Sequence, residues 1–266
     1  MKLSLPKIRY SLYYPAIMSI LLLVGITTSF YVYIKVSGSE KRNLLRRSET
    51  LAQALNSDWI ISLAGDETDL TNPQYILLKE KLFAIKQVNP DLRFVYLTGR
   101  KDGQIFFIVD SEDPQSDSYS PPGQIYPEAS ADFIAIFDTK KSFLEGPLAD
   151  RWGSWISALS PIIDKKTGEM IASVGVDIAA EDYSRTVWLY SAFPLLITLF
   201  LLVLVMVGWI IGKKEEKIME IKSEFVSIAS HDIRSPLTGI MWMLESFSAG
   251  AKDNFTEPQK KKHEKY

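Results

Sequence analysis

The chain has 266 residues and a formal net charge of −2, and 47% of its residues are hydrophobic. This balance excludes a strongly basic domain, so we expect no nucleic-acid partner. The absence of cysteine excludes disulfides, thiolate metal sites and cysteine nucleophiles. With only two histidines, far apart in the chain, we expect no metal site.

The first apolar run, residues 12–34, contains no charged residue. A helix of about 20 apolar residues crosses a bilayer, and tyrosines lie at both ends of this run, as interfacial aromatic residues do. A cleaved signal peptide is the alternative, but its apolar core would be shorter, about 7–15 residues, and would end at a small-x-small site. We therefore expect a retained transmembrane helix, preceded by a cytoplasmic tail over residues 1–11.

A second apolar run covers residues 186–211 and is also uncharged. Four lysines follow it within residues 213–222, which places its C-terminal side in the cytoplasm by the positive-inside rule. Two spans return the N-terminus to the cytoplasm and leave residues 35–185 outside, a segment of ordinary domain size. The basic residues within 35–47 disagree with this rule, but long translocated loops largely escape it.

The outer segment begins with helical patterns. Apolar residues recur at helical spacing over residues 38–63 and 73–88, which predicts two helices. The acidic, proline-rich residues 110–130 predict a loop, and a short helix is expected over residues 131–137.

Two hairpins are predicted around these helices. Residues 93–98 and 104–109 are rich in β-forming side chains and flank a glycine-containing turn, and residues 154–163 and 170–178 repeat the arrangement. Helices combined with antiparallel hairpins give an α+β domain. The domain carries no catalytic motif of the GxSxG, HExxH or P-loop kind.

The order RFVYLTGRKDGQIFFIVDSE … DRWGSWISALSPIIDKKTGEMIASVGVDI, between a long helix and a second span, resembles an extracytoplasmic PAS-like sensor domain of the Cache type. The resemblance covers about residues 38–180 and implies a small-molecule ligand of unknown identity. We expect a pocket between the sheet and its covering loop. Tryptophan and tyrosine bury large amphipathic surfaces, and the candidate lining residues are Tyr96, Asp110, Trp152, Trp155 and Asp177. Alternatively, the tryptophans belong to the core and the aspartates close strand ends.

After the second span, residues 213–229 contain no proline or glycine, so the helix is expected to continue through a linker over residues 212–222. Two apolar lines follow helical spacing there. Two such lines on one helix favour a four-helix bundle over a two-stranded coil. The first line is Ile218, Ile221, Phe225 and Ile228, and the second is Val226, Ile233 and Ile240.

His231 falls outside the first line, so we expect it at the surface or flank of the bundle; it is followed by an acid and, later, by Pro236. A ring nitrogen of an exposed, unprotonated histidine can accept a phosphoryl group, and a nearby acid can assist proton transfer. The proline removes a backbone N–H and is expected to bend the helix. An ordinary surface histidine is the alternative.

The segment SHDIRSPL and its flanks, over about residues 218–250, resemble the H-box of sensor histidine kinases. The resemblance implies a homodimer in which His231 accepts the γ-phosphoryl group of ATP and passes it to an aspartate of a response regulator. It implies that Asp232 is the acid–base partner and that Ser235 stands where relatives carry the residue that positions water for phosphatase activity. It also implies a multi-pass protein of a bacterial inner or plasma membrane, in contact with its lipid.

Residues 223–266 are then an incomplete dimerisation and phosphoacceptor domain, with a second helix of the hairpin expected near Thr256. The motifs of the ATP-binding domain do not occur, so no cofactor is expected in this chain, and ATP and Mg²⁺ are expected at a missing C-terminal domain. A truncated sensor kinase is the interpretation we favour. The alternatives are an ATPase-less receptor or phosphoacceptor (decoy) partner of another kinase, and a receptor with a vestigial tail.

Overall fold

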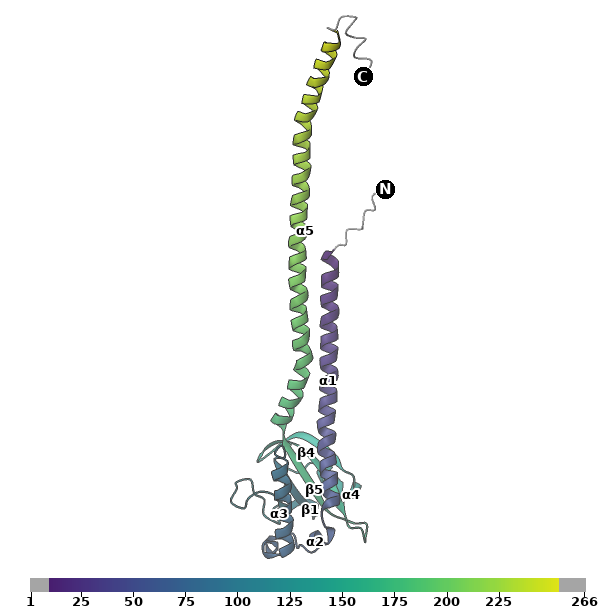
Figure 1. Ribbon diagram of the computed structural model, residues 1–266. Helices are drawn as coiled ribbons and strands as arrows, with labels where there is room; N and C mark the ends of the chain where they lie inside the picture. The colour runs from purple at the N-terminus through teal and green to yellow at the C-terminus, as the bar shows by residue number, and fades with distance from the viewer. Residues whose placement is uncertain (1–9, 254–266) are drawn as a thin grey trace. The chain divides into compact units, whose positions relative to one another are not determined.

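The computed structural model describes residues 10–253, with the side chains of residues 13–246. The chain divides into two compact units, and the unit of residues 23–198 contains the whole sheet and its covering helices. Figure 1 shows the sheet, the two long helices α1 (Tyr10–Ala54) and α5 (Ala180–Asp253), and the shorter helices packed on the sheet.

Two helices of the described chain, α1 and α5, are long and apolar enough to cross a membrane, and they contain both predicted spans. The helix predicted over residues 38–63 is a continuation of α1 as far as Ala54. It ends there because Asn56 caps a separate short helix, α2 (Ser57–Ile61), by accepting a hydrogen bond from the backbone N–H of Asp58. The prediction was therefore wrong at its C-terminal end.

The sheet has five strands in the order β2-β1-β5-β4-β3, and all neighbouring pairs are antiparallel. Both predicted hairpins are confirmed, as β1–β2 and β4–β5. The strands are β1 (Phe94–Lys101), β2 (Gln104–Asp110), β3 (Phe143–Asp150), β4 (Gly153–Ile163) and β5 (Met170–Ala179).

Strand β3 was not predicted, because Gly146 and Pro147 weaken a strand pattern. The structure tolerates them because β3 lies at the edge of the sheet and its register with β4 shifts between Glu145 and Leu148.

The sheet is covered on both faces, because side chains alternate along each strand. One face packs on α1 and α3 (Pro73–Val88), which begins where predicted, after its Asn72 cap. The buried side chains of this aliphatic core include Leu44, Leu78, Leu82, Val95, Leu97, Ile156, Val174 and Val176.

The other face packs on α4 (Ala131–Thr139), which starts after the Ser130 cap and extends two residues beyond its predicted end. The core on this face of the sheet is largely aromatic. A short 3-10 helix, η1 (Glu67–Thr71), precedes α3 in the chain. The buried members of this aromatic core are Phe94, Tyr96, Ile105, Phe107, Phe133, Ile136, Trp155 and Leu159.

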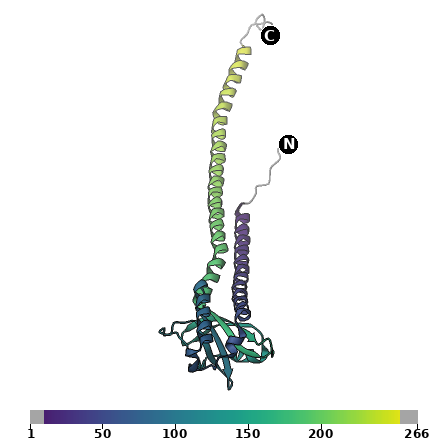
Figure 2. The ribbon, with the colours of Figure 1, turned by 60° about the horizontal axis from the view of Figure 1, so that its bottom comes forward.

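Within residues 23–198, the two long helices contact each other through small and polar side chains. The Ser29 hydroxyl donates to the carbonyl oxygen of Ser191 over 2.5 Å, and the hydroxyl oxygens of Ser37 and Tyr183 are 2.6 Å apart. A Cβ on Gly25 would lie 2.2 Å from Oγ1 of Thr198, so glycine permits this close approach, as small residues do between membrane helices. Figure 2 shows the two helices leaving the sheet side by side.

A substitution at Gly175 of β5 tests the packing of the aromatic face. A Cβ there would lie 2.2 Å from the Tyr96 ring, so Gly175→Ala should force the ring to move and lower the free energy of unfolding by about 1–3 kcal/mol. Denaturant unfolding of the full chain, followed by near-UV circular dichroism, measures this. Gly239→Ala is the matched control, since nothing lies within 4 Å of its added Cβ. Equal stability of Gly175→Ala and the wild type would contradict this packing.

Candidate functional site

A small cavity opens into the aromatic face of the sheet, beneath the segment that connects β2 to α4. Its volume is about 20 Å³, which is enough for about one water molecule. Aromatic rings and carboxyl groups dominate its wall. The lining residues are Phe94, Tyr96, Phe107, Asp110, Ser118, Ser120, Tyr126, Asp150, Trp152 and Asp177.

The structure brings four of the five predicted pocket residues to this cavity: Tyr96, Asp110, Trp152 and Asp177. The fifth, Trp155, is buried in the core behind the wall. Its ring meets the ring of Phe94 edge-on, with the centroids 5.0 Å apart. In this structure Trp155 thus lies in the core and not on the cavity wall.

Asp150, which the sequence analysis missed, holds the aromatic wall in place. Its Oδ1 accepts hydrogen bonds from the backbone N–H of Trp152 over 2.8 Å and from Nε1 of Trp155 over 2.9 Å. Its Oδ2 accepts from the Tyr126 hydroxyl over 3.1 Å. The Tyr126 and Trp152 rings are stacked, with centroids 6.1 Å apart. One carboxylate thus holds the side chains of Tyr126 and Trp155 and the backbone of Trp152.

Phe94, Phe107 and Tyr126 were also missed. Phe94 and Tyr96 occupy alternate positions of β1 and so share a face, a signal that was available in the predicted strand. Tyr126 and Asp150 had no comparable signal. Tyr126 lies in the segment predicted only as a loop, and Asp150 ends the strand that was not predicted.

Asp177 is 5% exposed and lies opposite Phe94 on β1 and Ser157 on β4. Burial raises the pKa of its carboxyl group to about 7, although hydrogen bonds from Ser157 and Tyr96 act in the opposite direction. The Tyr96 hydroxyl donates to Oδ1 over 3.2 Å. Within the described part of the chain, Asp177 has no ion-pair partner.

Asp110 has a different role, because it anchors the segment above the cavity. Its two oxygens accept hydrogen bonds from the backbone N–H groups of Glu112, over 2.5 Å, and Ser120, over 2.7 Å. Burial raises its pKa to about 6, against the effect of these hydrogen bonds and of Lys79. Lys79 in turn donates to the carbonyl oxygens of Asp110 and Glu112. The segment is therefore fixed to α3 as well as to the sheet.

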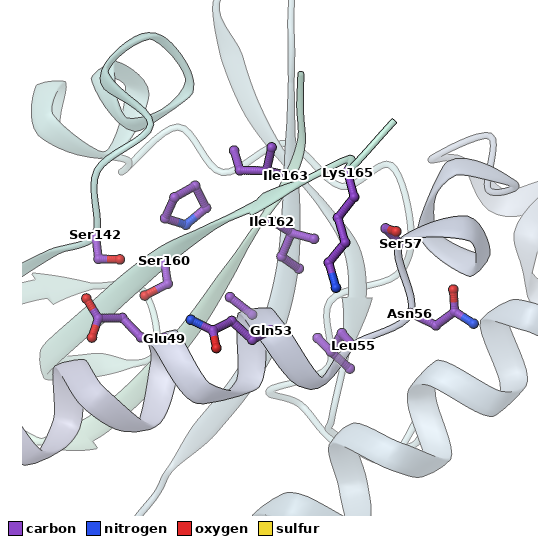
Figure 3. Close-up of a pocket in the computed structure, with 12 residues that line it drawn as sticks. Glu49, Gln53, Leu55, Asn56, Ser57, Ser142, Ser160, Ile162, Ile163 and Lys165 are labelled. Atoms are coloured by element: carbon purple, nitrogen blue, oxygen red, sulfur yellow. The ribbon is translucent and has the colours of Figure 1, made fainter. Parts of the chain in front are cut away.

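A larger groove of about 690 Å³ lies on the opposite face of the sheet, between the end of α1 and β4. Figure 3 shows Glu49 and Gln53 of α1 facing Ser160 of β4 across it. None of the described residues that line it is a buried acid or base. Ser160, its buried polar residue, is already hydrogen-bonded to Ser48 over 2.6 Å. The smaller cavity is the better candidate despite its size, because it holds a buried carboxyl group with no cationic partner.

The candidate phosphoacceptor lies far along α5, on its surface. The side chain of His231 is 86% exposed and that of Asp232 is 73% exposed, with Nδ1 and Oδ1 3.5 Å apart. Ser235 is also exposed, and the helix continues through Pro236 without interruption. The expected second helix of the hairpin, near Thr256, lies outside the described residues.

Both apolar lines of α5 are exposed in the single chain. The side chains keep more than half of their surface accessible to solvent, although large apolar residues at heptad spacing ordinarily face a partner helix. The exposed members are Ile218, Ile221, Phe225, Val226, Ile228, Ile233 and Ile240.

No protein-family model matches the chain, and no curated protein matches it. Among solved structures it is similar to the ligand-binding domain of the Campylobacter jejuni chemoreceptor Tlp3 in complex with L-valine, at 16% identity and a TM-score of 0.41, over 64% of this chain and 66% of that one. The sensory domain of Tlp3 gives 15% identity and a TM-score of 0.40, over the same shares of the two chains.

A third similar structure is the extracellular domain of mmHK1S-Z2, a protein described as a histidine kinase. It has 15% identity and a TM-score of 0.30, over 55% of this chain and 61% of that one. The matches span less than two thirds of the other chains, and all three TM-scores are below 0.5. The fold is therefore defined by the strand order and the buried core of this chain itself.

Replacing Asp177 tests the electrostatics of the cavity. Because its pKa is raised from 3.8 to about 7, the folded state binds more protons than the unfolded state between these values, and stability falls as the pH rises from 4 to 7. Asp177→Asn should remove this loss, which is on the order of 4 kcal/mol. Unfolding of both proteins across this pH range gives the difference.

The surface variant Asp58→Asn controls for the change in net charge, since Asp58 is 64% exposed. Parallel pH profiles for the wild type and Asp177→Asn would show that the Asp177 carboxyl group is not perturbed by burial.

Proposed function

We propose that this chain is a transmembrane sensor of the histidine kinase type. A PAS-like domain of the Cache type binds a small molecule outside the membrane and controls phosphorylation of His231 in the cytoplasm. One observation carries the proposal. Strand β5, which places Asp177 in the cavity, ends at Ala179, and α5 begins at Ala180. The same helix contains the second apolar run and His231.

The absence of a linker between β5 and α5 supports a mechanical route for the signal. Asp177 lies three positions before the start of the helix, so a ligand that contacts it acts close to Ala180. A ligand shifts a two-state equilibrium only through contacts that differ between the states. Small helix shifts or rotations are a common form of such a switch. In this proposal the position of α5 relative to α1 is the switched quantity, and Ser29 and Ser191 mark their contact.

The exposure of His231 supports its role as acceptor. A ring nitrogen attacks the γ-phosphorus of ATP, an N–P bond forms, the bond to the bridging oxygen breaks, and ADP leaves. Asp232 is the acid–base partner that helps to remove the ring proton. The phosphoryl group then passes to an aspartate of a response regulator, and Ser235 positions the water that hydrolyses this aspartyl phosphate in the phosphatase activity.

The two exposed apolar lines of α5 support a homodimer. Paired with a second copy, both lines would be buried in a helical bundle, and burying apolar surface is the main favourable contribution to such association. Completing a four-helix bundle requires the second helix of each hairpin, which is predicted near Thr256 and lies outside the described residues.

The 266 residues contain no motif of an ATP-binding domain, so the proposal assigns the binding of ATP to a separate domain or protein. A second candidate function is an ATPase-less receptor or phosphoacceptor that another kinase phosphorylates. Both functions use His231 as the acceptor, and they differ only in where the ATP and Mg²⁺ are held.

Phosphorylation in membrane vesicles tests the acceptor. With radiolabelled ATP and a histidine kinase ATP-binding domain supplied in trans, the chain should gain an acid-labile, base-stable label that His231→Gln abolishes. Asp232→Asn should slow labelling by about a hundredfold or more, as the loss of a general base does. Ser227→Ala, on the same exposed helix, is the matched control and should label normally. A label that persists in His231→Gln would rule out His231 as the acceptor.

Insertions at Lys217 test coupling through α5. One or two added residues rotate the downstream helix by roughly a quarter or half turn, and should change labelling of His231 about fivefold or more. A seven-residue insertion restores the heptad register and serves as the control, with near wild-type labelling. If the short insertions leave labelling unchanged, the signal does not pass through a continuous helix.

A further inference from the structure

We infer that the cavity on the aromatic face binds a small organic ammonium ion, a cation that carries no carboxylate of its own. The inference deepens the proposed function, because it rests on this cavity being the sensory site and names the class of its ligand. Three features carry it: an uncompensated buried carboxyl group, aromatic walls, and basic residues at the rim that are already paired.

The buried carboxyl group without a cationic partner is that of Asp177. Isolated charges are buried in proteins only at a large free-energy cost, so buried acids are normally paired. Asp177 receives a hydrogen bond from Tyr96 but no cation, and none of the ten described residues that line the cavity is basic. A bound cation would satisfy this carboxylate.

The other two acids of the wall are already occupied. Asp150 accepts hydrogen bonds from Tyr126, Trp152 and Trp155, and Asp110 accepts them from two backbone N–H groups. Neither has both oxygens free for a ligand. Asp150 nevertheless adds negative potential, because it is among the charges that raise the pKa of Asp177. Asp177 is thus the group that would contact the ligand, and Asp150 makes the electrostatic potential around it more negative.

The aromatic walls suit the same ligand. The faces of aromatic rings attract cations, most strongly when water is excluded. Phe94 and Trp152 already do so at the rim, where the Arg93 guanidinium lies 4.4 Å from the Phe94 centroid and the Arg151 guanidinium lies 5.0 Å from the Trp152 centroid. The rings of Tyr96, Phe107 and Tyr126 complete the wall.

A zwitterion such as an α-amino acid lacks a partner for its carboxylate here. Two arginines beside the wall already have acidic partners: Arg93 pairs at 3.3 Å with Glu112, an acid that Lys86 also contacts, and Arg151 pairs with Glu128 at 2.6 Å. Binding a second carboxylate among these acids would break one of these pairs or leave the ligand's charge unmet. The charge pattern therefore favours a monocation over both zwitterions and anions.

The present volume of about 20 Å³ is too small for any organic ammonium ion. Binding must move the segment over the cavity, where Ser118 and Ser120 form the outer wall. Ser118 is held by Arg93 over 3.2 Å, and Ser120 by Asp110. Ligand binding would therefore be coupled to displacement of this segment.

Calorimetric titration of the full chain in lipid nanodiscs tests the inference with two matched sets of probes. The first set is ethanolamine, ethylene glycol and glycine. The second is choline, its neutral carbon isostere and glycine betaine. Within at least one set, the cation should bind at least about tenfold more tightly than both the neutral and the zwitterionic compound. Asp177→Asn, which keeps the shape of the side chain, should abolish this preference, and Asp58→Asn should retain it.

Equal or tighter binding of the zwitterion, a preference that survives in Asp177→Asn, or no binding of either cation would overturn the inference. A near-UV spectrum of Asp177→Asn matching that of the wild type shows that lost binding is not lost folding. The titration does not involve ATP or His231, so failure of the phosphorylation test would leave this result standing, and the reverse also holds.

Discussion

Strand β5 is the constraint on which the rest of this structure depends. It is hydrogen-bonded to β1 on one side and β4 on the other, and most of its residues are buried. Its last residue is followed directly by the first residue of α5. Because two neighbouring strands hold β5, its C-terminal end cannot shift without altering the sheet. The pocket residue Asp177 and the start of the membrane helix therefore belong to one mechanical element.

The aromatic and aliphatic faces of the sheet differ in the interactions that stabilise or destabilise their cores. The aliphatic core gains stability from burying apolar surface, whereas the aromatic core accommodates Asp110 and Asp177 at unfavourable electrostatic cost. Protein sites that bind ligands commonly retain such unfavourable features. Asp150 limits the cost by turning a third carboxylate into a support for the rings. Because of this arrangement, the smaller cavity is a better candidate for a ligand site than the larger groove.

The long helices α1 and α5 make contacts of a different kind from those in the sheet. Where α1 and α5 contact each other, small and hydroxyl side chains let the backbones approach, as at Gly25 and Ser29. Beyond the apolar run, α5 presents two unpaired apolar lines and the exposed His231. Under the proposed function these features belong together: the lines hold two copies of the helix, and the exposed histidine remains accessible to a phosphoryl donor.

Local patterns were sufficient for much of this protein. Charge-free runs, hairpin turns and capping residues such as Asn72 act over a few residues, so the two long apolar helices, the α3 helix and both hairpins were predictable. The H-box resemblance likewise depends on a short string around His231. Strand β3 was not predictable, because Pro147 is acceptable only in an edge strand, and edge position is a property of the whole sheet.

The sequence by itself determined the order of the two long apolar helices, the α+β character of the domain between them and four of the residues at its cavity. Only the tertiary structure decided which side chains meet there. Asp150 and Tyr126 come from segments without a predictive pattern, and Trp155 faces the core because of its register on β4. The raised pKa of Asp177 also depends on the tertiary structure, since burial and the absence of a nearby cation depend on every element packed around this residue.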